Sequence, residues 1–179
     1  MNSGKRLEQD IKKSIDLKQI YYLRLKDSPS SFGQDSGYVR FTGDNPYDIL
    51  MFYNGCLFPT ELKNTKNTSF SVQKSKDEPK KMIKYNQIKG LIEASRYAGV
   101  YAGFLLNFED GKCYWVDIRN FVGFITQTEK KSVNEQDIIQ MNPIEVNKRK
   151  LKVSYRYEIK ELLDSLVRKE GRKNATTDI

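Results

Sequence analysis

The sequence DILMFYNGCLFPTELK spans residues 48–63 and decides the fold class. It consists of two runs rich in apolar and aromatic residues, 48–53 and 56–63, on either side of Asn54-Gly55. Both turn residues tolerate positive φ angles, so the pattern predicts a tight β-hairpin. Pro59 lacks a backbone N–H, and we expect it where a missing donor does no harm to the sheet.

Helical and strand patterns alternate along the rest of the chain. They cover, in chain order, residues 7–15, 20–25, 88–99, 100–108, 112–116, 132–139 and 159–167. The first, the third and the last two have helical spacing of apolar residues, and Ser132 with Glu135 fits a capping box. The pair 100–108 and 112–116 predicts a second hairpin around Asp110-Gly111. This order predicts a single domain, residues 1–179, of the α/β class with a mixed sheet.

Three segments have loop composition. Residues 27–46 are dense in Ser, Gly, Asp and Pro and predict a long loop or a small projecting hairpin. Residues 73–84 are charged and contain a proline, which predicts a mobile loop. The chain ends in residues 169–179, which we expect to fray.

Composition excludes several kinds of chemistry. The chain has 31 Lys and Arg against 23 Asp and Glu, a net charge of +8, and it has no histidine. Histidine-based triads, histidine-ligated zinc sites and imidazole pH switches are therefore excluded. Cys56 and Cys113 lie apart on apolar stretches, so we expect reduced, buried thiols and a cytoplasmic protein. The absence of an apolar leader or a long apolar stretch favours the same compartment.

Charged residues on the first hairpin mark a candidate site. Strand alternation places Glu61 and Lys63 on one face, and the return of the hairpin brings Asp48 near Glu61. Two carboxylates there would suit Mg²⁺, and a neighbouring lysine could offset charge on a phosphodiester under attack. A purely structural cross-strand ion pair would give the same pattern of three charged residues. A basic protein with an acidic centre favours a polyanionic substrate.

The run ELKNTKNTSF, residues 61–70, resembles the motif of RecU-type Holliday junction resolvases, within the PD-(D/E)xK nuclease superfamily. Asp48 has the family's spacing from Glu61, and residues 85–88, YNQI, resemble the His-Gln-Ile start of a helix in that family. The resemblance continues through FLLNF, CYW, Lys131-Ser132-Val133 and the helix over 155–166, and covers residues 4–168. The chain departs from the family at Pro46, where a threonine is usual, and in an insertion around 75–81.

This resemblance implies a restriction-endonuclease-like core and cleavage of four-way DNA junctions in recombination and repair. It implies that Asp48 and Glu61 ligate Mg²⁺ or Mn²⁺, that Lys63 stabilises the transition state, and that Gln87 sits at the metal or positions its water. Glu8 resembles the acidic residue that the superfamily places near the site on its first helix. A solvated helix charge is an equal alternative for Glu8. The resemblance also implies a homodimer and a shortened stalk over residues 28–46.

Basic residues near the motif are candidates for DNA contacts. They are Arg40 in the stalk region, with Tyr38 beside it, and Lys66, Lys74, Lys76, Lys80 and Lys81 after the motif. Lysines in such positions would contact phosphates and make binding dependent on salt. An exposed, solubilising loop is the alternative for the lysines. The aromatic residues expected in the core are Tyr21, Tyr22, Phe52, Phe70 and Phe104.

Three other functions stay open at this stage. A less selective nuclease of the same superfamily would keep the chemistry without the preference for junctions. A DNA-binding recombination accessory would keep the basic surface, with the carboxylates serving only as structure. A protein-interaction module would bind a partner independently of salt. The sequence also leaves open whether a bacterium or its virus encodes the chain.

Overall fold

In the computed structural model, which describes residues 3–25 and 45–174, the Asn54-Gly55 turn closes the predicted hairpin. Strand β2 is Ile49–Tyr53 and strand β3 is Cys56–Thr65, and the two pair antiparallel. Both turn residues have positive φ angles, 48° for Asn54 and 75° for Gly55. Pro59 pairs with Leu50 of β2, and the ladder between β3 and β5 begins one residue later, at Thr60. The missing N–H of Pro59 therefore removes no hydrogen bond between β3 and β5.

The hairpin belongs to a six-stranded sheet with the order β1-β2-β3-β5-β6-β8. The additional strands are β1 Tyr21–Arg24, β5 Gly103–Phe108, β6 Cys113–Asp117 and β8 Ile144–Glu145. Strands β3 and β5 are parallel and all other neighbours are antiparallel. The predicted α/β class with a mixed sheet and the second hairpin are therefore confirmed.

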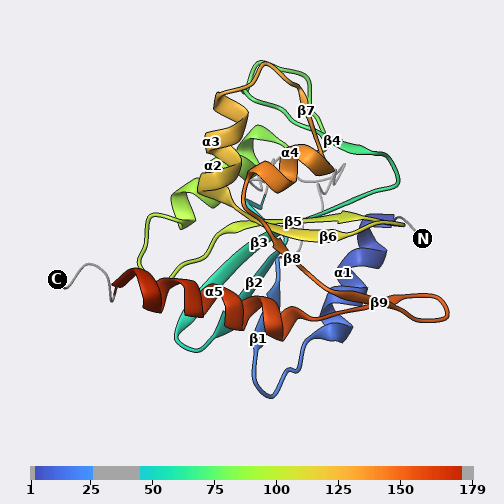
Figure 1. Cartoon of the computed structure of the whole chain (residues 1–179), viewed down its shortest axis with the longest axis vertical. Coiled ribbons are helices and arrows are strands. Elements are labelled where there is room, and N and C mark those ends of the chain that lie inside the picture. Colours follow the sequence, from blue (N-terminus) through green and yellow to red (C-terminus); the bar gives the residue numbers. More distant parts are fainter. Residues whose placement is uncertain (1–2, 26–44, 175–179) are drawn as a thin grey trace, which may run out of the picture.

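Helices cover both faces of the sheet (Figure 1). Apolar side chains of α1 Ser3–Ser14 and α5 Ile159–Asn174 pack on one face with Met51, Phe58 and Trp115. Helices α2 Tyr85–Ala94, α3 Ile118–Thr126 and α4 Glu135–Gln140 cover the other face, over Phe104 and Val116. Because parallel strands need a crossover, the segment that contains α2 connects β3 to β5. The described residues contain no helix long and apolar enough to span a membrane.

Helix α3 was not predicted. Its sequence, IRNFVGFIT, contains β-branched and aromatic residues and a glycine, which have low helix propensity. The helix forms because Phe121 and Ile125 are buried against the sheet and the Asp117 carboxylate accepts a hydrogen bond from the N–H of Arg119. Tertiary packing overrides local preference here.

Several predicted boundaries are wrong. Helix α2 ends at Ala94, not near residue 99, and β5 begins at Gly103. The box that opens α4 is formed by Asn134 and Asp137, whereas Ser132 lies in strand β7. Helix α5 continues to Asn174, so residues 169–174 are helical, not a frayed end.

Two short ribbons flank the main sheet. They consist of β4 Ser69–Ser71 with β7 Ser132–Asn134, and of β9 Lys148–Lys150 with β10 Tyr155–Tyr157. The charged segment 73–82 is a loop, as predicted, and its neck is closed because the Gln73 N–H donates to the Ile83 carbonyl at 2.9 Å. The predicted long loop over 27–46 lies almost entirely outside the described residues.

The five aromatic residues expected in the core differ in their burial. Phe70 and Phe104 are fully buried and Tyr22 is half-buried. Tyr21 and Phe52 were expected in the core but are 57% and 45% exposed, because they pair with each other on a part of the sheet face left open. Cys56 and Cys113 are both free thiols, as predicted, but only Cys113 is buried, whereas Cys56 is partly exposed.

Two glycine-to-alanine substitutions should change stability in opposite directions. A Cβ at Gly103 would lie 2.7 Å from the Trp115 ring and closer still to the Val116 carbonyl oxygen. We expect Gly103→Ala to lower the free energy of unfolding by about 2 kcal/mol or more. Gly123 lies exposed in α3 with open space around it, so Gly123→Ala should raise that free energy by about 0.5–1 kcal/mol. Urea unfolding of both variants checks the signs, and a neutral Gly103→Ala would contradict this packing.

Candidate carboxylate site

The hairpin register brings Asp48 beside Glu61. Asp48 comes directly before β2, and the pairing of Ile49 with Thr60 continues to these two residues. The Leu62 N–H donates a hydrogen bond of 2.8 Å to Oδ2 of Asp48. The backbone of β3 therefore fixes the position of this carboxylate. Asp48 and Glu61 lie close together, as predicted.

Glu61 and Lys63 lie on the same face of β3. Leu62, between them, packs in the core under α1 and α5, so its two neighbours point to the opposite face. The Lys63 ammonium lies 2.8 Å from Oε1 of Glu61. The Glu61 side chain is only 2% exposed and that of Lys63 is 12% exposed. A buried carboxylate with one lysine beside it forms the centre of the site.

Gln87 connects this centre to helix α2. Its Nε2 donates a hydrogen bond to Oε1 of Glu61, and its Oε1 accepts one from the Lys84 N–H at 3.0 Å. The same amide therefore satisfies a donor at the start of α2 and orients the glutamate. The resemblance implied that Gln87 contacts the metal or its water, whereas in this structure the amide holds Glu61.

Electrostatics favour a neutral or neutralised Glu61. Burial raises the pKa of Glu61 to about 8, Lys63 opposes that rise, and the nearby Asp48 adds to it through charge and hydrogen bonding. The two carboxyl groups are thus close enough to share a proton. Two carboxylates this close repel each other. Ionising both is therefore unfavourable unless a cation lies between them, and without a cation one of them keeps a proton.

The donor set fits a hard divalent cation. Asp48 and Glu61 offer carboxylate oxygens, the ligand type that Mg²⁺ prefers, and Mg²⁺ usually keeps several waters when only one or two carboxylates bind it. Within residues 3–25 and 45–174 there is no group of three or more His, Cys, Asp and Glu placed to hold a metal. A cation at this site would therefore complete its shell with water, backbone or substrate oxygens.

Glu8 lies outside the hydrogen-bonded cluster of the described residues. Its Oε2 is 2.6 Å from the Arg24 guanidinium. Burial raises the pKa of Tyr22, and the charges of Glu8 and Asp48 raise it further. That hydroxyl is buried without a hydrogen-bond partner in the described structure. Sequence reasoning assigned Tyr22 to the core and missed its position near the acidic residues.

The predicted DNA-binding lysines divide into two groups. Lys66, Lys76, Lys80 and Lys81 are exposed, and Lys66 lies 4.0 Å from Glu109. Lys74 differs, because its ammonium donates to the carbonyl oxygens of Ile125 and Thr128, near the end of α3. Lys74 therefore anchors the loop, and its contact with a DNA phosphate stays a prediction. Arg40 and Tyr38 lie outside the described residues.

Comparison with known proteins shows that the chain is similar in sequence to a prophage protein. It is 34% identical over 182 residues to the SPbeta prophage-derived uncharacterized protein YotM of Bacillus subtilis (strain 168). The match covers 94% of this chain and 89% of YotM. Among solved structures it is similar to Hjc of Archaeoglobus fulgidus, a Holliday junction resolvase, with a TM-score of 0.49 and 16% identity over 79% of this chain and 95% of Hjc. No protein-family model matches the chain.

The raised pKa of Glu61 makes a prediction about stability in the absence of metal. The folded state holds this proton up to about pH 8, whereas the unfolded glutamate titrates near 4.5. The stabilisation is therefore complete below about pH 4.5 and is lost as the pH rises through 8. Glu61→Gln is uncharged throughout, so its unfolding free energy should not share this decline. Urea unfolding in EDTA across this range measures the difference.

Glu145→Gln is the matched control. Glu145 also lies 2.8 Å from a lysine, Lys112, but the pair is exposed. This variant should follow the pH dependence of the natural protein. Parallel curves for Glu61→Gln and the natural protein would show that the pKa of Glu61 is the same in the folded and the unfolded state, which would contradict the raised pKa.

Proposed function

The chain belongs to the same family as YotM of Bacillus subtilis, and we propose that this member is a metal-dependent DNA endonuclease that cleaves four-way junctions. The observation that carries the proposal is the pair of adjacent carboxyl groups, Asp48 and Glu61, with Lys63 beside them in a buried position. An ordinary surface ion pair would not need to be buried or to contain two acids. The arrangement supports a cation site next to a positive side chain.

Each residue has a separate role in this proposal. Asp48 and Glu61 hold the cation, and Gln87 keeps Glu61 oriented through its hydrogen bond. Lys63 balances negative charge that builds on the phosphate during attack. A bound Mg²⁺ or Mn²⁺ would supply an activated water and a Lewis acid for phosphodiester hydrolysis. Water attacks in line, the 3′ oxygen leaves, and the cut strand carries a 5′ phosphate.

The choice of DNA junctions rests on the motif resemblance and on charge. The run 61–70 and Gln87 resemble the RecU-type motif, and the whole chain carries a net charge of +8. Exposed Lys66, Lys76, Lys80 and Lys81 are available for phosphate contacts. A two-fold homodimer would place two sites on opposed strands, as paired cleavage of a junction needs. Recombination and repair are the processes that supply such a substrate.

Metal binding can be tested without DNA. We expect Mg²⁺ or Mn²⁺ to raise the melting temperature of the natural protein, because a ligand that binds only the folded state stabilises it. The shift should grow between about pH 6 and 8, because a cation must displace the proton on Glu61. Asp48→Asn and Glu61→Gln should lose the shift, and Glu145→Gln should keep it. An equal shift in all variants would place the cation elsewhere.

Cleavage is tested with a labelled immobile four-way junction beside a linear duplex of matching sequence, in Mg²⁺, Mn²⁺ or EDTA. We expect paired nicks in the junction that need metal, and a loss of rate of about 100-fold or more in Lys63→Ala and in Glu61→Gln. Lys112→Ala is the matched control for Lys63→Ala, since Lys112 also pairs with a glutamate at 2.8 Å but is exposed.

The other outcomes distinguish the alternatives. Equal cutting of duplex and junction would support the proposed phosphodiester hydrolysis but reject the preference for junctions. The protein would then be a less selective nuclease. Salt-dependent DNA binding without cleavage in either metal would reject the enzyme and favour an accessory that binds DNA. If the protein binds neither the junction nor the duplex, the protein-interaction module is the remaining alternative.

A further inference from the structure

The ribbon formed by β9 and β10, residues 148–157, carries only positively charged side chains among its ionised groups. Its sequence is KRKLKVSYRY, with five basic residues and no acidic one. The strands pair antiparallel, and the Leu151 N–H donates to the Ser154 carbonyl at 2.8 Å, which closes the turn between them. Figure 1 shows this basic ribbon extending beyond the body of the molecule, on the side where the N-terminus lies. The proposed cleavage chemistry uses none of its residues.

The basic ribbon is fixed to helix α1 along its second strand. The Tyr155 N–H donates to Oδ2 of Asp10 at 3.0 Å, and Tyr157 is buried in the core under α1 and α5. At the tip, the Arg6 guanidinium donates to the Val153 carbonyl. A surface that is already held in place loses little conformational entropy when it binds a partner.

Two arginines lie opposite each other on the basic ribbon. Arg149 is in register with Arg156, so both side chains leave the same face, and both are exposed. Like charges directly opposite each other on neighbouring strands destabilise the pairing. Within the part of the chain that the structure describes, neither side chain has a hydrogen bond or an ion pair. An anion bound by both arginines would relieve their repulsion.

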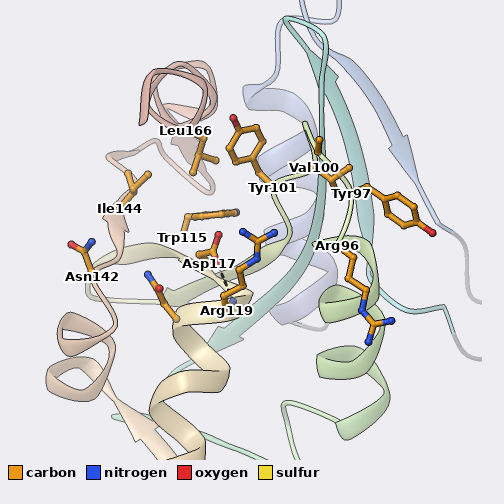
Figure 2. Close-up of a pocket in the computed structure, with 12 residues that line it drawn as sticks. Arg96, Tyr97, Val100, Tyr101, Trp115, Asp117, Arg119, Asn142, Ile144 and Leu166 are labelled. Atoms are coloured by element: carbon orange, nitrogen blue, oxygen red, sulfur yellow. Dashed lines mark hydrogen bonds between the residues drawn. The ribbon is translucent and has the colours of Figure 1, made fainter. Parts of the chain in front are cut away.

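Arginines elsewhere in the molecule bond within the chain. Arg24 pairs with Glu8 at 2.6 Å. Figure 2 shows Arg119 next to Asp117 in the wall of a cavity of about 490 Å³, and the Arg119 guanidinium donates to the Ser95 carbonyl. These internal contacts use donors and offset charge. The two arginines of the basic ribbon differ from them, because their guanidinium groups are directed to solvent with no acid beside them on the ribbon.

The tip of the basic ribbon lies toward the same end of the sheet as the carboxylate site. Arg6, which holds the tip, is two residues before Glu8 in α1. Glu8 pairs with Arg24, and Arg24 is in register with Ile49, the residue that follows Asp48. Helix α1 and strand β1 therefore connect the tip to Asp48 through a short series of contacts. A long ligand that reaches the carboxylates can also reach the ribbon.

From the charge, exposure and position of the basic ribbon we infer that it binds a duplex arm of DNA beside the cleavage site. The two opposed arginines contact phosphates, whose geometry matches the planar fork of a guanidinium group. A single small anion would meet only that pair, whereas a row of phosphates also meets Lys150 and Lys152, which are exposed on the same ribbon. The inference rests on the proposed function, because it takes DNA as the substrate.

The apolar tip fits the same partner. Leu151 is 42% exposed and Val153 is 79% exposed, and basic residues flank both of them. Contacts of a protein with DNA include the sugars as well as the phosphates, and the sugars offer apolar surface. The tip would lie against them while the arginines hold the backbone.

Binding is measured in EDTA, so that no strand is cut, from the fluorescence anisotropy of a labelled four-way junction and a duplex at several KCl concentrations. The slope of log K against log salt concentration falls by about 0.9 for each phosphate that the protein neutralises. Arg149→Gln combined with Arg156→Gln should make this slope shallower by about 2 and weaken binding about tenfold or more near 0.1 M salt.

Three further variants are matched to this one. Lys13→Gln combined with Lys18→Gln also removes two exposed positive charges, at the far end of α1 from the tip, and should keep the slope of the natural protein. Arg149→Lys combined with Arg156→Lys retains both charges and should keep the slope as well. Val153→Ser should weaken binding severalfold at an unchanged slope, because losing an apolar contact releases no counterions.

An unchanged slope in the arginine-to-glutamine variant would overturn the inference, and so would an equal loss of slope in the variant of Lys13 and Lys18. Binding of the natural protein to vesicles of anionic lipid, but not to DNA, would assign the ribbon to a lipid surface instead.

The inference and the proposed function can fail separately. Glu61→Gln should bind DNA with the slope of the natural protein, because the ribbon does not contain Glu61. Junction cleavage together with equal binding by both double glutamine variants would keep the nuclease and reject the ribbon. DNA binding that depends on the two arginines, without cleavage in any metal, would keep the ribbon and reject the nuclease.

Discussion

The structure depends on one buried carboxylate, Glu61, and on the groups that surround it. A charge taken out of water is costly unless it is paired, and Glu61 is surrounded by an ammonium group, a glutamine amide and a second acid. Those groups come from the residue before β2, from β3 and from α2. The Asn54-Gly55 turn sets the register that brings the second acid, and the crossover helix supplies the amide. Hairpin, parallel ladder and helix must therefore all be correctly placed before this glutamate can be buried.

The sheet divides the molecule into two chemical faces. Strand alternation sends Leu62 into the core under α1 and α5 and its neighbours to the opposite side. The same alternation on β6 sends Trp115 to the first face and Val116 to the second. A single sheet thus keeps the acidic site on the face covered by α2, α3 and α4, apart from the core under α1 and α5.

Local patterns predicted some parts of this arrangement and could not predict others. The hairpin and the common face of Glu61 and Lys63 follow from turn chemistry and a period of two, so the sequence sufficed for them. The amide of Gln87 came from a motif resemblance, because no short-range pattern places a helix start against a strand. Helix α3 has poor intrinsic propensity, so its formation depends on tertiary packing. Lys74 looked like its exposed neighbours because composition does not tell which way a lysine points.

The closed neck of the loop 73–82 has a consequence for how this family can vary. Val72 bridges Ile83, the Gln73 N–H donates to the same residue, and Lys74 is tied to α3. Chain length beyond that neck can change without moving the start of α2. Insertions and deletions in evolution, or a tag added by an engineer, would be absorbed there, and relatives can differ in this loop while conserving the geometry around it.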